Sequence, residues 1–178
     1  TRMRIHRVEE GMVLERDSIY LIPPKKLMTV KGGRLSLTER EAARQLEFPI
    51  NVFLDSLATD YGPQSVAVVL SGTGTDGTQG VRSVHEAGGL VIIQSLDSAD
   101  FNGMPRSAIN TELADYVLPP ERMPEAILTY AKFPQLRMVQ NARPMTAHEA
   151  ASSFGPVLEQ LRHTYGIDFG EYKIPTVQ

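Results

Sequence analysis

The 178-residue chain is expected to fold as an α/β domain with a doubly wound, mainly parallel sheet. The first observation is the Val-rich run at 65–70, whose lack of alternation is typical of a parallel strand buried on both faces. The second is the order of the next segments: a Gly-rich turn, a helical pattern over 78–87 and an apolar strand at 90–93 complete a strand–helix–strand unit of about 30 residues. The third is that helical and strand patterns continue to alternate as far as residue 130.

A short strand and a hairpin are expected before this unit. Residues 18–22 form an apolar run that two prolines close, so a strand should end there. The runs at 27–30 and 35–37 flank Gly32 and Gly33, and two adjacent glycines that tolerate positive φ predict a β-hairpin. Residues 38–45 are charged and are expected to form a surface connection.

Helices are expected in most of the remaining chain. Apolar residues at positions 52, 53, 57, 58 and 61 share one face of a helix that opens near Pro49 and ends at Gly62. A short helix at 108–113, a short strand at 116–118 and a helix at 120–130 with Pro at its start come after it. The composition changes after residue 134, and 146–165 predict a separate helical extension that Gly155 and Pro156 interrupt.

Composition and charge exclude several classes of protein. The hydrophobic share of 42% and charged share of 22% indicate a soluble globular protein. The absence of Cys excludes disulfides and zinc–thiolate sites and is compatible with a cytoplasmic location. The net charge of -3 argues against a general nucleic-acid surface. The apolar runs are too short to span a bilayer, so direct membrane insertion is not expected.

The loop at 71–77 is the expected functional site, because ligands of open α/β sheets bind where loops leave the carboxyl ends of strands. Four glycines, at 72, 74, 77 and 80, allow tight turns and close approach of the backbone. Asp76 could cap the following helix, bind a cation or orient a catalytic His. A phosphate-binding loop is disfavoured, because the glycine spacing and the Lys of such loops are missing.

Several motifs together point to one family. Residues 70–80 read Leu-Ser-Gly-Thr-Gly-Thr-Asp-Gly-Thr-Gln-Gly, and further motifs occur at 8–11, 19–24, 48–51, 86–89, Gln94 and 103–109. In order and spacing they resemble the chemotaxis protein-glutamate methylesterases, the CheB family, whose loop reads Gly-Met-Gly-x-Asp-Gly-Ala-x-Gly. The resemblance covers residues 5 to 130.

The resemblance implies hydrolysis of glutamate γ-methyl esters on methyl-accepting chemoreceptors in the cytoplasm, with glutamine deamidation as a second reaction that the same site could support. It assigns Asp76 as the acidic member of a Ser-His-Asp triad. Thr73 stands where the free-standing enzymes usually have Met near the oxyanion pocket, so its part in oxyanion binding is left open. No metal or organic cofactor is implied.

Two loops would surround this site. The active-site loop comprises Gly72, Thr73, Gly74 and Gly77. A second loop, at Gly103, Met104 and Pro105, resembles an active-site edge, with a plain strand-to-helix turn as the alternative.

The family's nucleophile and base are not found in the sequence. The Ser belongs to a Gly-x-Ser-Thr-Gly-Gly loop and the His to the next strand unit, and neither motif occurs. His6 lies in a segment that matches the strand after those motifs, His85 is expected on the solvent side of its helix, and His148 and His163 belong to the C-terminal extension. No matching nucleophile accompanies any of them.

Two explanations remain open. The chain is either an N-terminally truncated piece of an active enzyme, which its start at Thr1 favours, or a degenerate domain that binds a receptor or partner without catalysis. Nucleotide binding at the Gly-rich loop is a third class. A sheet without its first strands would have a bare edge, which makes self-association a hazard.

The tail carries a second resemblance. Residues 161–173 read Leu-Arg-His-Thr-Tyr-Gly-Ile-Asp-Phe-Gly-Glu-Tyr-Lys, which resembles the opening of chemotaxis receptor methyltransferases, with an amphipathic helix ended by Gly as the alternative. We therefore expect residues 1–134 to be the C-terminal part of a CheB-type domain. Residues 135–178 are then a linker and helix at the start of a CheR-type domain, in a methylesterase–methyltransferase fusion, with no S-adenosylmethionine site in this piece.

Overall fold

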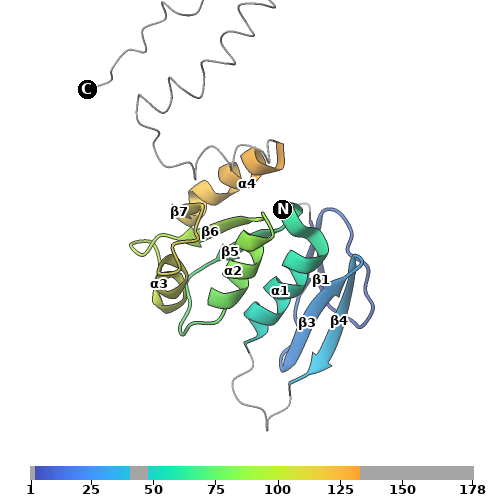
Figure 1. Ribbon diagram of the computed structural model, residues 1–178. Helices are drawn as coiled ribbons and strands as arrows, with labels where there is room; N and C mark the ends of the chain where they lie inside the picture. The colour runs from blue at the N-terminus through green and yellow to red at the C-terminus, as the bar shows by residue number, and fades with distance from the viewer. Residues whose placement is uncertain (1–2, 41–47, 133–178) are drawn as a thin grey trace, which may run out of the picture. The chain divides into compact units, whose positions relative to one another are not determined.

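The computed structural model describes residues 3–40 and 48–132, which lie in the N-terminal compact unit of the chain, Thr1–Val139. Within them it confirms an α/β fold with mainly parallel sheets and a β-hairpin (Figure 1). The helical extension expected at 146–165 lies outside the described residues.

A three-stranded parallel sheet carries the expected functional loop. Its order is β5 (Val66–Val69), β6 (Leu90–Gln94) and β7 (Tyr116–Leu118). Every residue of β6 is buried. The expectation that the Val-rich run at 65–70 is buried on both faces was wrong, because in β5 Val69 is buried but Val68 is 39% exposed. Strand β5 is an edge strand of this sheet, and the core on its Val66 face is built mainly from β6 and α4. Parallel neighbours need crossover connections, and helices α2 (Thr78–Glu86) and α3 (Gly103–Ile109) provide them.

Two further strand pairs form the N-terminal part. Strands β1 (Arg4–Arg7) and β2 (Ser18–Leu21) are parallel. Strands β3 (Lys26–Lys31) and β4 (Arg34–Glu39) form the predicted hairpin, whose turn residues Gly32 and Gly33 have φ of 57° and 70°. Strand β4 continues through Glu39, so the connection expected from residue 38 begins later than predicted. The alternating sequence 34–39 keeps its strand pairing although its last residue, Glu39, is charged.

Helix α1 (Pro49–Tyr61), followed by the 3-10 turn η1 (Gly62–Gln64), matches the helix predicted from Pro49. Helix α4 (Met123–Lys132) comes after a second 3-10 turn, η2 (Pro120–Arg122). The prediction of a helix at 108–113 was wrong, because α3 begins at Gly103. Pro105 is tolerated there since the first helical turn has no intrahelical partners for its N–H groups.

Helix α1 takes part in two hydrophobic cores. On one side its residues Leu54 and Ala58 pack with α2, α3 and one face of β5 and β6. On the other side Phe53 and Leu57 pack against the hairpin, and Figure 1 shows α1 between the hairpin and α2. A third core, formed by β6 and α4, covers the opposite face of the sheet.

Asp60, near the end of α1, fixes the hairpin turn to the helix. Its carboxylate accepts hydrogen bonds from the N–H groups of Gly32 at 2.7 Å and Gly33 at 3.0 Å. The amides of Gly33 and Gly32 hold the pKa of Asp60 below its ordinary value, with a smaller contribution from the charge of Lys31, while partial desolvation opposes the shift. The hairpin therefore stays attached to α1 through an ionised side chain.

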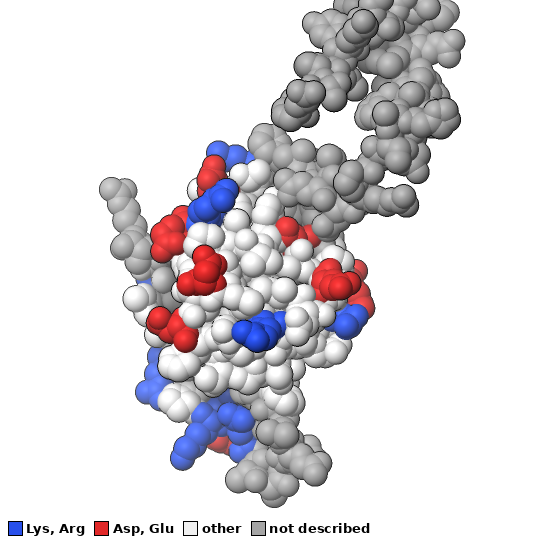
Figure 2. Space-filling view, turned by 90° about the vertical axis from the view of Figure 1, so that its left-hand side faces the viewer, with Lys and Arg blue, Asp and Glu red and all other residues white. Residues whose placement is uncertain are grey.

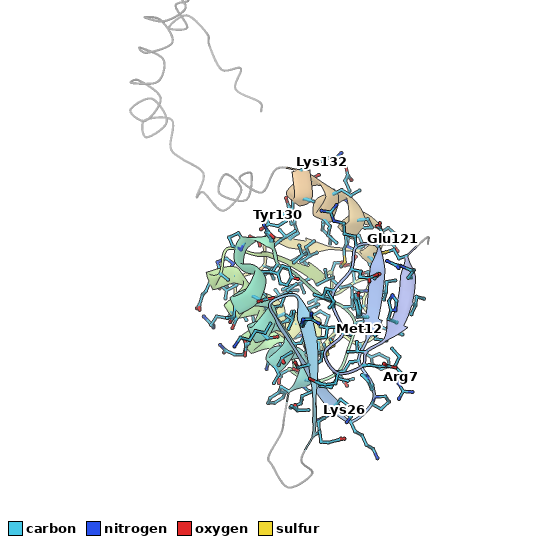
Figure 3. All side chains as sticks on the ribbon, turned by 90° about the vertical axis from the view of Figure 1, so that its right-hand side faces the viewer. Arg7, Met12, Lys26, Glu121, Tyr130 and Lys132 are labelled. Carbon is cyan, nitrogen blue, oxygen red and sulfur yellow. The ribbon has the colours of Figure 1, made fainter. Side chains whose placement is uncertain are left out.

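The outer surface carries dispersed charge. Figure 2 shows Asp and Glu side chains separated by uncharged surface, and a group of Lys and Arg at the lower end of that face. In Figure 3, α4 with Tyr130 and Lys132 lies at one end and the hairpin residue Lys26 towards the other. Within the described ranges, no helix is both long enough and apolar enough to cross a membrane.

Candidate active site

The loop between β5 and α2 lies at the carboxyl end of a parallel strand, where the sequence predicted a functional site. Gly74 and Gly77 have φ of 86° and 96°, a conformation that favours glycine. Gly77 is the N-cap of α2 and, having no side chain, cannot cap that helix itself. The two glycines let the loop reverse direction before α2 begins.

Asp76 caps α1 rather than the following helix. Its Oδ2 accepts a hydrogen bond from the Ile50 N–H at 3.1 Å, and its Oδ1 accepts one from the Asn51 N–H at 3.0 Å. The interpretation as a cap of the following helix was wrong, because Asp76 stands one residue before the N-cap and its side chain crosses to α1. The first turn of α1 has no side-chain cap of its own at Phe48, so Asp76 satisfies amides that the helix leaves unpaired.

This arrangement leaves Asp76 able to bind a further donor. Each carboxylate oxygen can accept two hydrogen bonds, and each uses one on α1. The residue is half-buried, so its remaining acceptor positions can be reached from outside the loop. The first turn of α1 also carries the positive end of the helix dipole, which favours a negative charge. The geometry suits a carboxylate that orients a neighbouring N–H group.

Asn51 provides a second link between the helices that sequence reasoning did not single out. Its Oδ1 accepts a hydrogen bond from the Gly80 N–H, in the first turn of α2, at 2.9 Å. Gly80 is required by close packing, since a Cβ there would lie 2.5 Å from the Leu54 Cβ and 3.2 Å from the Asn51 Cα. In the sequence the residue appeared only as the last position of the motif at 48–51, with no role assigned to it.

The structure brings the second predicted loop against the first. The Met104 N–H donates to the Gly72 carbonyl at 2.9 Å, and the Gly72 N–H donates to the Phe101 carbonyl at 2.8 Å. A Cβ on Gly72 would lie 2.5 Å from the Met104 Sδ, and a Cβ on Gly103 would lie 3.0 Å from the Gly74 nitrogen. Residues 103–105 therefore form one wall beside the 72–77 loop, and they also open α3, as the alternative of a strand-to-helix turn predicted.

The outer part of the loop is accessible. Thr73 and Gly74 are exposed, and Pro105 on the α3 side is buried. Thr73 and Gly74 therefore lie on the open side of the loop, whereas Gly72 is held by the opposite loop.

Gln94, at the end of β6, holds the start of the 71–77 loop by a hydrogen bond. It is only 5% exposed, and its Oε1 accepts a hydrogen bond from the Ser71 N–H at 2.7 Å. Its Nε2 donates to the Ser98 carbonyl at 2.8 Å, and the Ser71 Oγ accepts from the Phe101 N–H at 2.9 Å. One buried amide thus joins the first loop to the segment that leads into the second.

Neither described histidine is a hydrogen-bond partner of Asp76. His6, in β1, stacks on Tyr20 with ring centroids 5.3 Å apart. His85 was expected on the solvent side of α2, but it is half-buried and its Nδ1 lies 3.1 Å from the Leu113 carbonyl, because this side of α2 packs against the segment after α3. His148 and His163 lie outside the described residues. Across residues 3–40 and 48–132, no cluster of three His, Cys, Asp or Glu could hold a metal ion.

Comparisons with known proteins identify the family and the fold of the chain. The model of the CheB methylesterase family matches residues 1–127. The crystal structure of the Thermotoga maritima CheB methylesterase catalytic domain superposes with a TM-score of 0.61 at 29% identity, over 69% of this chain and 67% of that one.

Two curated proteins show how much of a longer relative the chain represents. It is 30% identical over 132 residues to the protein-glutamate methylesterase/protein-glutamine glutaminase of Pyrococcus abyssi, covering 72% of this chain and 36% of that protein. It is 40% identical, along its whole length, to an uncharacterized 104.1 kDa protein of Rhodobacter capsulatus, of which it covers 21%. The chain thus spans about a third of the first protein and about a fifth of the second. Through residues 1–127, which include both loops of the site, the chain belongs to the CheB methylesterase family.

Proposed function

We propose that this chain supplies the carboxylate of a protein-glutamate methylesterase site that acts on chemoreceptors in the cytoplasm. The observation that carries the proposal is the position of Asp76. It stands in the loop that follows β5, both of its oxygens are fixed by α1, and Thr73 and Gly74 earlier in the same loop are exposed. The proposal also rests on the protein-glutamate methylesterase/protein-glutamine glutaminase activity named for the Pyrococcus abyssi relative.

In this mechanism a Ser hydroxyl attacks the ester carbonyl of a methylated glutamate while a His accepts the hydroxyl proton. Asp76 accepts the other imidazole N–H, which keeps one tautomer and stabilises the imidazolium. The His then gives its proton to the departing methoxide, methanol leaves, and water hydrolyses the acyl-enzyme. With a glutamine substrate the leaving group is ammonia. The backbone N–H groups of the exposed residues Thr73 and Gly74 are the candidates for binding the oxyanion.

We further propose that the Ser and His lie on a segment outside this sequence. Neither the Gly-x-Ser-Thr-Gly-Gly motif nor its His-bearing strand occurs in the 178 residues. We also propose that 135–178 joins this domain to a CheR-type methyltransferase domain. The motif at 161–173 supports this, as does full-length similarity to a 104.1 kDa protein. Sequence preceding residue 1 that lacks the Ser and His motifs would refute the first of these proposals.

The test compares Asp76→Asn and Asp76→Ala with the wild type in a protein that joins this chain to the Ser and His segment. Methanol release from methylated receptor should fall on the order of 10³- to 10⁴-fold in kcat for both variants, because the imidazole loses its orienting acceptor. Asp97→Asn, at an exposed carboxylate of another loop, is the matched control and should keep full activity. Methanol release by Asp76→Ala at the wild-type rate would refute the proposal.

The same assay on the 178-residue chain alone should detect no methanol. Hydrolysis by this chain, abolished by Asp76→Ala, would show that its nucleophile is present after all. Receptor binding by the longer protein without any hydrolysis would favour the alternative of a non-catalytic binding module. Calorimetry with ATP or GTP tests the nucleotide-binding alternative at Gly72 and Gly74.

A further inference from the structure

We propose that Asn51 is a positioning residue of the site: by tying α1 to α2, it holds the α1 amides that fix Asp76. The proposal rests on the catalytic function proposed for Asp76. The underlying geometry can nonetheless be tested without any enzymatic reaction.

The two helices cap each other. Asp76 precedes α2 and accepts hydrogen bonds from two amides of α1, whereas Asn51 belongs to α1 and accepts one from the Gly80 amide of α2. In the first turn of each helix, one or two N–H groups thus find an acceptor in a side chain from the other helix or its leading loop. Either cap keeps the first turns of α1 and α2 in the register that the other cap needs.

Close packing restricts the helices to this register. At Gly80 a Cβ would meet the Asn51 Cα at 3.2 Å, and at Gly77 a Cβ would meet the Ile50 Cγ2 at 3.1 Å. Both close approaches occur in the same turn of α1 that donates to Asp76. If the Asn51 link is lost, the start of α1 can move away from α2, and the two bonds to Asp76 lengthen with it.

This matters for the chemistry because a triad carboxylate must hold an imidazole in one orientation. Two bonds, one to each oxygen, prevent the Asp76 carboxylate from rotating about its terminal torsion. A carboxylate released from α1 can still accept a proton donor, but from a wider range of directions. Loss of Asn51 should therefore slow the reaction itself and leave substrate binding largely intact.

A matched control exists on the same pair of helices. The Ser83 hydroxyl donates to the Asp55 carboxylate at 2.6 Å, one turn further along α1 and α2 from Asn51 and Gly80. Ser83→Ala removes one link between α1 and α2, as Asn51→Ala does, but it leaves the first turns untouched. Any general loosening of the helix pair would appear in both variants.

The first readout is amide hydrogen exchange, measured by NMR on the 178-residue chain. Asn51→Ala should speed exchange of the Ile50 N–H about five- to tenfold, the factor that the loss of one capping contact implies. Asn51→Asp keeps an acceptor for the Gly80 N–H and should stay near the wild-type rate, as should Ser83→Ala. Unchanged Ile50 exchange in Asn51→Ala, or equal acceleration in Ser83→Ala, would overturn the proposal.

A second variant, Asp76→Ala, tests the same coupling from the other helix in case Asn51→Ala does not fold. Coupling between two contacts acts equally in both directions, so Asp76→Ala must speed exchange of the Gly80 N–H by a similar factor. An exchange rate of the Gly80 N–H that stays the same in Asp76→Ala would also overturn the proposal.

The second readout is kinetic, in the longer protein that carries the Ser and His. Asn51→Ala should lower kcat about tenfold with KM unchanged, and Asn51→Asp should recover most of the loss. If Asp76→Ala leaves activity intact while the exchange results hold, the proposed function fails and the coupling between the helices stands. If Asp76→Ala abolishes activity while Asn51→Ala has no effect on kcat or exchange, the positioning role of Asn51 fails alone.

Discussion

Replacing Gly80 with Ala tests how closely α1 and α2 must approach for the site to form. The added Cβ would lie 2.5 Å from the Leu54 Cβ, 2.9 Å from its Cδ1 and 3.2 Å from the Asn51 Cα. The Leu54 Cβ and the Asn51 Cα cannot rotate out of the way, because one is the first side-chain carbon and the other is backbone. The helices must therefore separate to admit a single methyl group.

Two effects of opposite sign determine the magnitude. Overpacking of this kind typically costs about 1–3 kcal/mol, and contact with backbone places Gly80→Ala toward the upper end. Alanine in place of glycine within a helix returns about 1 kcal/mol. We therefore expect a net loss of about 1–2 kcal/mol in the free energy of unfolding.

Urea titration followed by far-UV circular dichroism measures this loss as a lower midpoint with an unchanged slope. Gln79→Ala is the matched control, because Gln79 is the exposed neighbour of Gly80 in the same turn and should shift stability by less than about 0.5 kcal/mol. If Gly80→Ala were as stable as the wild type or more stable, helix propensity would outweigh packing, and the close approach of the two helices would be wrong.

Three further substitutions test the contacts around the site by the same titration. Gln94→Leu should cost about 1–3 kcal/mol, because the Ser71 N–H loses its buried acceptor, and Gln64→Leu at an exposed position should cost little; equal losses would contradict this. Asp60→Asn should destabilise the fold at neutral pH. The pKa of Asp60 in the folded state lies below the ordinary 3.8, so the loss of stability should be complete above pH 3.8. It should disappear as the pH falls through the lowered pKa. A loss of stability that grows on acidification would contradict this direction of the pKa shift. Tyr130→Phe should cost about 1 kcal/mol, because the single hydroxyl proton is shared between the Pro63 and Gly88 carbonyls, and an unchanged midpoint would show that this hydrogen bonding adds nothing.

Much of the fold could be predicted because its signals are local. The Val-rich run at 65–70 predicted β5, the adjacent Gly32 and Gly33 predicted the hairpin turn, and the helix expected at 78–87 is α2, Thr78–Glu86. The start of α3 was missed because Gly103 and Pro105 suggest a loop, although both are tolerated in a first helical turn.

The contacts within the site could not be predicted in the same way. Asp76 was assigned by its neighbours in sequence, which made a cap of the next helix the ordinary expectation. Its actual partners, Ile50 and Asn51, precede it by 26 and 25 residues, and only the packing of α1 on α2 brings them together. His85 was misplaced for a related reason: the segment that covers it comes 28 residues later in the chain.

Two carboxylate contacts, one at each end of α1, restrict the length of this helix. The first turn of the helix binds Asp76, and Asp60, nine positions after Asn51, binds the hairpin turn. One residue inserted or deleted between these points would rotate one end against the other by about 100° and shift it by about 1.5 Å. Both attachments could not then be made at once. Evolution can therefore exchange side chains along α1, but it has to place insertions and deletions outside the stretch between Asn51 and Asp60.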